Sequence, residues 1–218
     1  MAGLQKLKIE HVSKQIKGSL VIDDISLMFV PGRIYGLRGI NGSGKTMLMR
    51  LICGLIRPTS GNIYYDDMEL GHDIFFPPDV GVLLENPSFL DGYTGYQNLK
   101  LIADIQKKIG EKEIKEILDK VGLEPTDKRK YKKYSLGMKQ RLGIAAALME
   151  QPDLVILDEP FNALDTDGVT MTANLIRNEK ERGALVIMAC HDREQLEFLA
   201  DEIIEISGGK AAKEKKGE

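Results

Sequence analysis

Apolar and polar residues alternate near the start of the chain. Leu7 to Val12 alternates in the way that a half-buried strand does, and Ser19 to Phe29 continues the pattern up to a turn at Pro31-Gly32. Gly61 to Tyr65 is strand-like as well. These segments predict an antiparallel β portion near the N-terminus.

Short, almost wholly apolar runs appear later and are typical of parallel strands covered on both faces. Segments with apolar residues at helical spacing lie between these runs. They predict helices over Lys45 to Leu55 and over Val169 to Arg182. This alternation of strand and helix predicts an α/β fold with a mainly parallel sheet. The runs are Arg33 to Leu37, Leu154 to Leu157 and Leu185 to Ala189.

The middle of the chain has a different pattern. Tyr96 to Gly122 and Lys139 to Met149 place apolar residues at helical spacing, which predicts a mostly helical lobe over about residues 87–150. The last segment, Gly208 to Glu218, is small and charged and is expected to fray.

Composition narrows the classes of function. The 218-residue chain is 43% hydrophobic with a net charge of −3, which gives no electrostatic case for nucleic-acid binding. Cys53 and Cys190 lie far apart in apolar surroundings, which favours buried reduced thiols over a disulfide framework. No run approaches the roughly 18 apolar residues of a membrane span, and Met1 to Glu10 does not resemble a signal peptide. Any membrane span that the protein needs is therefore expected on another chain.

A glycine-rich segment leads into the helix predicted from Lys45. Gly39 to Thr46 matches the phosphate-loop pattern G-x-x-x-x-G-K-S/T, in which glycines let backbone N–H groups point at phosphate oxygens. Lys45 is expected to reach the β- and γ-phosphates of a nucleoside triphosphate, and Thr46 to ligate Mg²⁺. The predicted phosphate-binding residues are Asn41, Gly42, Ser43, Gly44, Lys45, Thr46 and Met47.

Two acids follow the apolar run that ends at Leu157. Asp158 is expected to hold Mg²⁺, directly or through water, and Glu159 to act as the general base that polarises an attacking water. An acidic turn after a buried strand is the alternative, and the phosphate loop upstream makes it the weaker interpretation.

A third motif carries a resemblance to a known family. Tyr134 to Arg141, Tyr-Ser-Leu-Gly-Met-Lys-Gln-Arg, resembles the L-S-G-G-Q signature of ABC ATPases, Phe161 to Asp165 resembles their D-loop, and His191 their switch histidine. The resemblance covers the chain from about Leu7 to Lys210. It implies one α/β domain over residues 1–218: a P-loop NTPase (RecA-like) core at about 1–86 and 151–207, a helical subdomain at about 87–150 and a flexible tail at 208–218.

The resemblance also implies a head-to-tail dimer, either with a second copy or with a paralogous ATPase. Ser135 and Gly137 of one chain would cap the γ-phosphate of the ATP held by Lys45 of the other. Asp165 would communicate across the interface, and His191 would contact the γ-phosphate and help to hold the attacking water.

The signature departs in part from the family's common pattern. Leu136 replaces its first glycine and Met138 its glutamine, while Ser135 and Gly137 are retained. Met47 replaces the Ser or Thr whose hydroxyl touches the α-phosphate in relatives, so only its backbone N–H remains available there.

Two further departures concern the nucleotide. Glu85 stands where the Q-loop glutamine is expected, and its carboxylate can still meet Mg²⁺ or water, but it adds negative charge near the triphosphate. Ile16 stands at about the position of an aromatic residue that stacks on adenine. Loss of that ring is expected to cost on the order of 1 kcal/mol, by analogy with base–aromatic stacking.

The Q-loop and signature variants resemble those of bacterial bacitracin- and lantibiotic-type exporter ATPases. This implies an ATPase that powers export of a drug, peptide or similar compound through transmembrane permease subunits, at the cytoplasmic face of the membrane. Asn86 to Leu99 is expected to meet those subunits, with Phe89, Tyr93 and Tyr96 as candidate contacts, although core packing explains each of them equally well.

Two other functions are alternatives to transport. An ABC ATPase that acts on ribosomes or DNA usually has a second module or a long coiled-coil insertion, and this sequence has neither. A small-molecule P-loop kinase would explain the phosphate loop but would leave Ser135, Gly137, Asp165 and His191 without a role.

Overall fold

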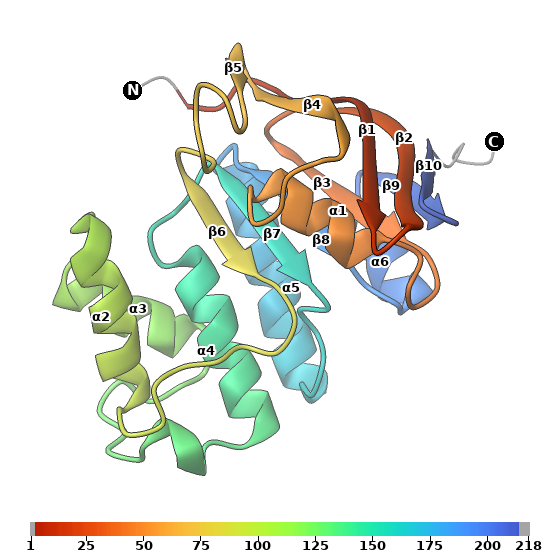
Figure 1. Ribbon diagram of the computed structural model, residues 1–218. Helices are drawn as coiled ribbons and strands as arrows, with labels where there is room; N and C mark the ends of the chain where they lie inside the picture. The colour runs from red at the N-terminus through yellow and green to blue at the C-terminus, as the bar shows by residue number, and fades with distance from the viewer. Residues whose placement is uncertain (1–2, 214–218) are drawn as a thin grey trace.

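The computed structural model describes residues 3–213 and contains two β-sheets (Figure 1). The smaller sheet is antiparallel, with strand order β2-β1-β4-β5. Its buried side chains alternate with exposed ones along β1 and β2, because one face of the sheet packs on the core. The strands are β1 (Leu7–Ile16), β2 (Ser19–Phe29), β4 (Ser60–Tyr65) and β5 (Met68–Glu69).

The larger sheet has six strands in the order β10-β9-β3-β8-β7-β6. All neighbours pair in parallel except β10, which is antiparallel to β9. Every residue of β7 and β8 is buried, which explains their continuous apolar sequence. The strands are β3 (Arg33–Arg38), β6 (Val80–Leu83), β7 (Leu154–Asp158), β8 (Leu185–Ala189), β9 (Glu202–Ser207) and β10 (Lys210–Lys213).

Helices cover both faces of the larger sheet. Figure 1 shows α1 between the two sheets, while α2, α3 and α4 gather in a lobe on the side away from β1 and β2. The helices are α1 (Lys45–Ile52), α2 (Gly95–Gln106), α3 (Glu111–Lys120), the 3₁₀ turn η1 (Tyr131–Lys133), α4 (Leu136–Leu148), α5 (Thr166–Glu181) and α6 (Arg193–Leu199).

The core has two parts, one on each face of the larger sheet. Ile156 of β7 packs with Leu48 of α1 and Phe29 of β2, whereas its neighbour Leu157 packs with the helical lobe, including Leu142 of α4. Successive strand residues point to opposite faces, so a single apolar strand supplies both clusters. This sheet fixes the helical lobe and the phosphate-loop helix relative to each other.

The predicted α/β fold is confirmed, but several boundaries differ. The first helix ends at Ile52 rather than at Leu55, because Gly54 has a φ of 71°. The helical pattern from Tyr96 to Gly122 belongs to two helices, α2 and α3, since Lys107 ends α2 with a φ of 57°.

The end of the chain requires a correction. Part of the segment predicted to be a flexible tail forms strand β10, in which Ala211 lies opposite Ile206 of β9. Partial burial of Ala211 against the core accounts for this order. Residues 214–218 of the predicted tail lie outside the described part of the chain. Among residues 3–213, no helix has the length and apolar character that crossing a membrane requires.

Candidate nucleotide site

The phosphate loop connects the carboxyl end of β3 to the first turn of α1. Gly39 is required by a close contact, because a Cβ there would lie 2.2 Å from the carbonyl oxygen of Ile206. Gly44 precedes α1 with a φ of 116°, a backbone conformation that glycine adopts most readily. None of the described residues in the first turn of α1 is acidic. The loop and the free N–H groups of the helix therefore suit an anion.

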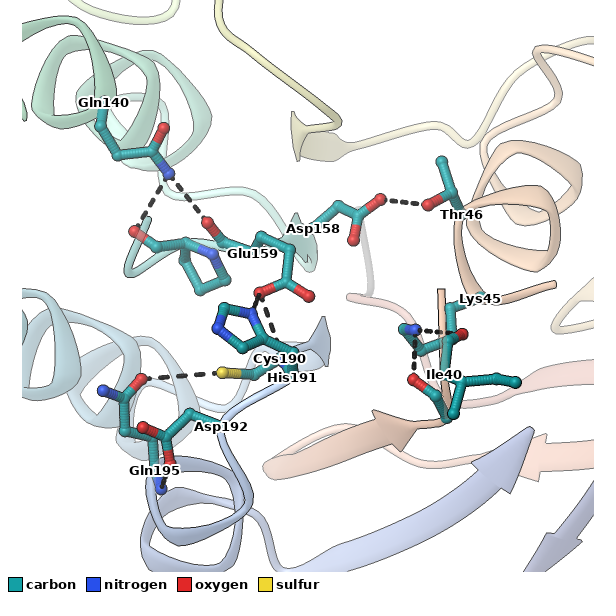
Figure 2. Close-up of polar contacts among 12 residues, drawn as sticks. Ile40, Lys45, Thr46, Gln140, Asp158, Glu159, Cys190, His191, Asp192 and Gln195 are labelled. Carbon is teal, nitrogen blue, oxygen red and sulfur yellow. Dashed lines mark hydrogen bonds and ion pairs between the residues drawn. The ribbon is translucent and has the colours of Figure 1, made fainter. Parts of the chain in front are cut away.

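Lys45 is held inside the curve of this loop. The side chain is largely buried, and Nζ donates hydrogen bonds to the carbonyl oxygens of Gly39 at 2.6 Å and Ile40 at 3.2 Å (Figure 2). Both acceptors are neutral carbonyl oxygens, so Nζ is bonded to no carboxylate that would compete with an incoming phosphate. Ser43 is also buried, and its Oγ has no hydrogen-bond partner among residues 3–213.

Thr46 and Asp158 meet at the start of α1 and the end of β7. Thr46 Oγ1 donates a hydrogen bond of 2.5 Å to Asp158 Oδ2 (Figure 2). Burial raises the pKa of the Asp158 carboxyl, the bond from Thr46 opposes this, and the charge of nearby Glu159 adds to the rise. A bound cation would favour the ionised carboxylate.

Glu159 and His191 lie at the ends of adjacent strands. His191 Nδ1 is 2.7 Å from Glu159 Oε2, and the backbone N–H of His191 donates to the same oxygen at 3.3 Å (Figure 2). A carboxylate only accepts, so this contact requires the imidazole proton on Nδ1. Gln140 of α4 donates to the carbonyl oxygens of Glu159 and Pro160, at 3.0 and 3.1 Å. Through Gln140 the helical lobe therefore contacts the backbone at Glu159.

A cavity of about 440 Å³ opens beside these groups. It brings together most of the predicted nucleotide and metal residues: Asn41, Gly42, Gly44, Lys45, Thr46, Met47, Glu85, Asp158 and Glu159. Sequence reasoning missed other lining residues, namely Val21, Arg50, Asn86, Gln140 and Asn162. Arg50 carried a signal that could have been used, because it follows Thr46 by four residues and so shares its helical face.

Ser135 and Gly137 lie apart from this cavity. Together with Asp165 they line a second hollow at the start of α4. Ser135 Oγ accepts a hydrogen bond from the N–H of Met138 at 3.2 Å and so caps α4. A Cβ at Gly137 would lie 2.8 Å from the carbonyl oxygen of Ala163, which requires glycine there.

Ile16 also lies outside the residues that line the nucleotide cavity. It ends β1, opposite Ser19, and is 36% exposed. Val21 of β2 lines the cavity instead. A contact between Ile16 and the base therefore stays a prediction.

The donor groups fit a magnesium nucleotide. Within residues 3–213 no three His, Cys, Asp or Glu side chains form a metal-binding group. Mg²⁺ commonly takes one or two protein oxygens and completes its shell with water and substrate phosphates. Thr46 and Asp158 supply such oxygens, and the cationic loop lies next to them.

Comparison with known proteins agrees with this geometry. The family model described as ABC transporter matches residues 22–162. The uncharacterized ABC transporter ATP-binding protein YybJ of Bacillus subtilis is 43% identical, over 94% of this chain and 94% of its own length. The bacitracin transport ATP-binding protein BcrA of Enterococcus faecalis is 36% identical, over 90% of this chain and 65% of its own.

Two further matches extend the comparison. The lantibiotic transport ATP-binding protein SrtF of Streptococcus pyogenes is 35% identical, over 96% of this chain and 90% of its own length. Among solved structures, the dimeric bacterial ABC transporter cassette MJ0796 is 25% identical, with a TM-score of 0.87 over 97% of this chain and 99% of that one.

The fold and the site define an ATP-binding cassette with a P-loop NTPase core. The chain belongs to the ABC transporter family and is an ATPase of that family. Its predicted resemblance to bacitracin- and lantibiotic-type ATPases is confirmed.

Proposed function

We propose that this ATPase powers export of a drug, peptide or similar compound through separate transmembrane permease subunits, at the cytoplasmic face of the membrane. The observation that carries the proposal is its similarity, over at least nine-tenths of the chain, to ATP-binding proteins of bacitracin and lantibiotic transport. The absence of a membrane-crossing helix within residues 3–213 fits spans supplied by another chain.

In this proposal ATP binds with its phosphates on the loop before α1. Lys45 leaves its two carbonyl acceptors and binds the β- and γ-phosphates, because a phosphate oxygen carries more negative charge than a carbonyl. Thr46 and Asp158 present oxygens that would hold Mg²⁺, and Glu85, which lines the same cavity, would meet the metal directly or through water. When bound, Mg²⁺ would supply neutralisation of the charge that develops on the phosphate oxygens.

Glu159 and His191 would act on the water. Glu159 lines the cavity and would accept a proton from the attacking water as general base. The bond from His191 Nδ1 fixes the direction of that carboxylate and leaves Nε2 available for the γ-phosphate. The pair therefore combines proton acceptance with positioning.

The remaining contacts would come from a second ATPase chain, either a copy or a paralogue. Ser135 and the backbone of Gly137 lie in a different hollow from Lys45, so neither caps the phosphate held by its own chain. A head-to-tail dimer would bring each signature to the partner's cavity. Closure with ATP and opening after hydrolysis would then drive the membrane subunits.

Co-purification tests the proposal most directly. The tagged chain is isolated from its native membranes, with the tag alone as control, and its partners are identified by mass spectrometry. A multi-span membrane protein in near-equal amount is the expected result, and uptake of cargo into inverted vesicles then tests the direction of transport. Ribosomal proteins or DNA without a membrane protein would favour the non-transport alternative.

A further inference from the structure

Arg50, which forms a close ion pair with Glu85 at the nucleotide cavity, has no role in the scheme above. Arg50 Nη2 donates to Glu85 Oε1, joining α1 to the segment that follows β6. Arg50 lies one helical turn beyond Thr46 and on the same face of α1. Glu85 has a φ of 58°, which non-glycine residues seldom adopt unless their surroundings hold them there. Both side chains line the cavity.

The charges around the cavity indicate why an ion pair at this place affects nucleotide binding. The ionisable lining residues are the acids Glu85, Asp158 and Glu159 and the bases Lys45 and Arg50. A nucleotide triphosphate is itself strongly anionic, so each uncompensated carboxylate opposes its binding.

We infer that Arg50 is a positioning residue that neutralises Glu85 and holds its carboxylate on the α1 side of the cavity. The inference rests on the proposed nucleotide site. It concerns how much a carboxylate at position 85 weakens the binding of an anionic nucleotide. Arg50 makes that carboxylate compatible with magnesium nucleotide. The nucleotide is bound by other groups, so Arg50 matters only while position 85 carries a negative charge.

A double-mutant cycle separates this role from direct contact between Arg50 and phosphate. The variants are Arg50→Met, which keeps an unbranched apolar stem, Glu85→Gln, and the two combined. The readout is the dissociation constant for Mg-ADP, measured by titration calorimetry at low and high salt. Arg50→Met is expected to weaken binding about tenfold at low salt and less at high salt, as an unscreened carboxylate would.

The affinity of Glu85→Gln is the reference for the double variant, and adding Arg50→Met to Glu85→Gln is expected to change that affinity by no more than about twofold. Arg50→Lys keeps the charge and is expected to bind nearly as wild type does. An equal loss from Arg50→Met with either residue at position 85 would overturn the inference, because it would mean direct contact with the nucleotide or a general structural effect. Wild-type affinity in Arg50→Met would overturn it as well.

Two controls keep this test distinct from that of the site itself. Thermal unfolding of each variant shows whether it is folded at the temperature of the titration, and Arg50→Gln, which also removes the charge, replaces Arg50→Met if the latter is not. Lys45→Ala reports on the site: if wild type and Lys45→Ala bind Mg-ADP equally well, the proposed site is wrong. If Lys45→Ala loses affinity for Mg-ADP while the effects of Arg50→Met and Glu85→Gln on affinity are additive, the inference is wrong and the proposed site stands.

Discussion

The nucleotide cavity differs from the signature hollow, which is the second hollow, lined by Ser135, Gly137 and Asp165. In the proposed site one chain supplies most contacts of the cavity, whereas the groups of the hollow lie apart from the nucleotide cavity of their own chain. At the cavity, Lys45, Thr46 and Asp158 are drawn together from strands and helices of the core and are bonded within it. At the hollow, Ser135 and Leu136 are exposed, and Leu136 is 75% accessible. The first region is organised before a ligand arrives, whereas the second offers groups to another molecule.

Packing explains the difference. Buried polar groups need partners, so the core fixes Asp158 against Thr46 and Lys45 against loop carbonyls. The polar groups of the signature hollow are satisfied locally, since Ser135 caps α4 and Asp165 caps α5. Capping leaves these groups at the surface, where a second chain can reach them. One region therefore depends on the core and the other on assembly.

The largest expected effect lies in the cavity. Lys45→Ala should weaken Mg-ATP binding about a hundredfold or more, because it removes the charge-assisted hydrogen bonds to two phosphates. Equilibrium binding of a fluorescent ATP analogue measures this. Lys112→Ala, an exposed position on α3, is the matched control and should bind normally. Unchanged affinity in Lys45→Ala would mean that the phosphate loop does not bind the phosphates of ATP.

Glu159→Gln should separate chemistry from binding in the same region. Loss of a general base lowers the turnover rate by about 10²–10⁴-fold, while ATP remains bound because no phosphate contact is removed. Phosphate release and nucleotide affinity are measured on the same preparation, with exposed Glu181→Gln as control. Normal turnover in Glu159→Gln would assign the base to another residue.

A mixing experiment tests the other side of the comparison. Ser135→Arg and Lys45→Ala should each abolish turnover when alone. Equal mixing gives half of the dimers one complete site of two, so about a quarter of wild-type turnover should return. Turnover that stays at zero, with both variants folded by circular dichroism and dimers present by light scattering, would argue that the signature does not serve a partner's site.

The same contrast explains what the sequence could predict. Strands β7 and β8 and the phosphate loop are short-range patterns, so they could be recognised without the fold. The lining residues Val21 and Gln140 come from segments far apart in the chain, and their roles depend on how β2 and α4 meet the cavity. Strand β10 was missed because its order comes from pairing with β9 rather than from its own small, charged sequence.

The smallest expected effect concerns the base of the nucleotide, where sequence and structure point to different strands. Ile16→Tyr should tighten adenine nucleotides by about fivefold if the position at the end of β1 faces the base, since stacking contributes on the order of 1 kcal/mol. Val21→Ala is the companion variant, because Val21 lines the cavity and Ile16 does not. Affinities for ADP and for inorganic triphosphate are compared, since only the former has a base.

An unchanged affinity for ADP in Ile16→Tyr, with weaker binding in Val21→Ala, would place the base against β2. Binding of inorganic triphosphate should be unaffected in both variants, because Lys45 is held by carbonyl groups of its own loop and does not depend on either side chain. Such a result would show that the two ends of the cavity depend on different parts of the chain. Its phosphate end would be fixed by core packing, and its base end would tolerate replacement of the aromatic ring, as the signature hollow tolerates Leu136.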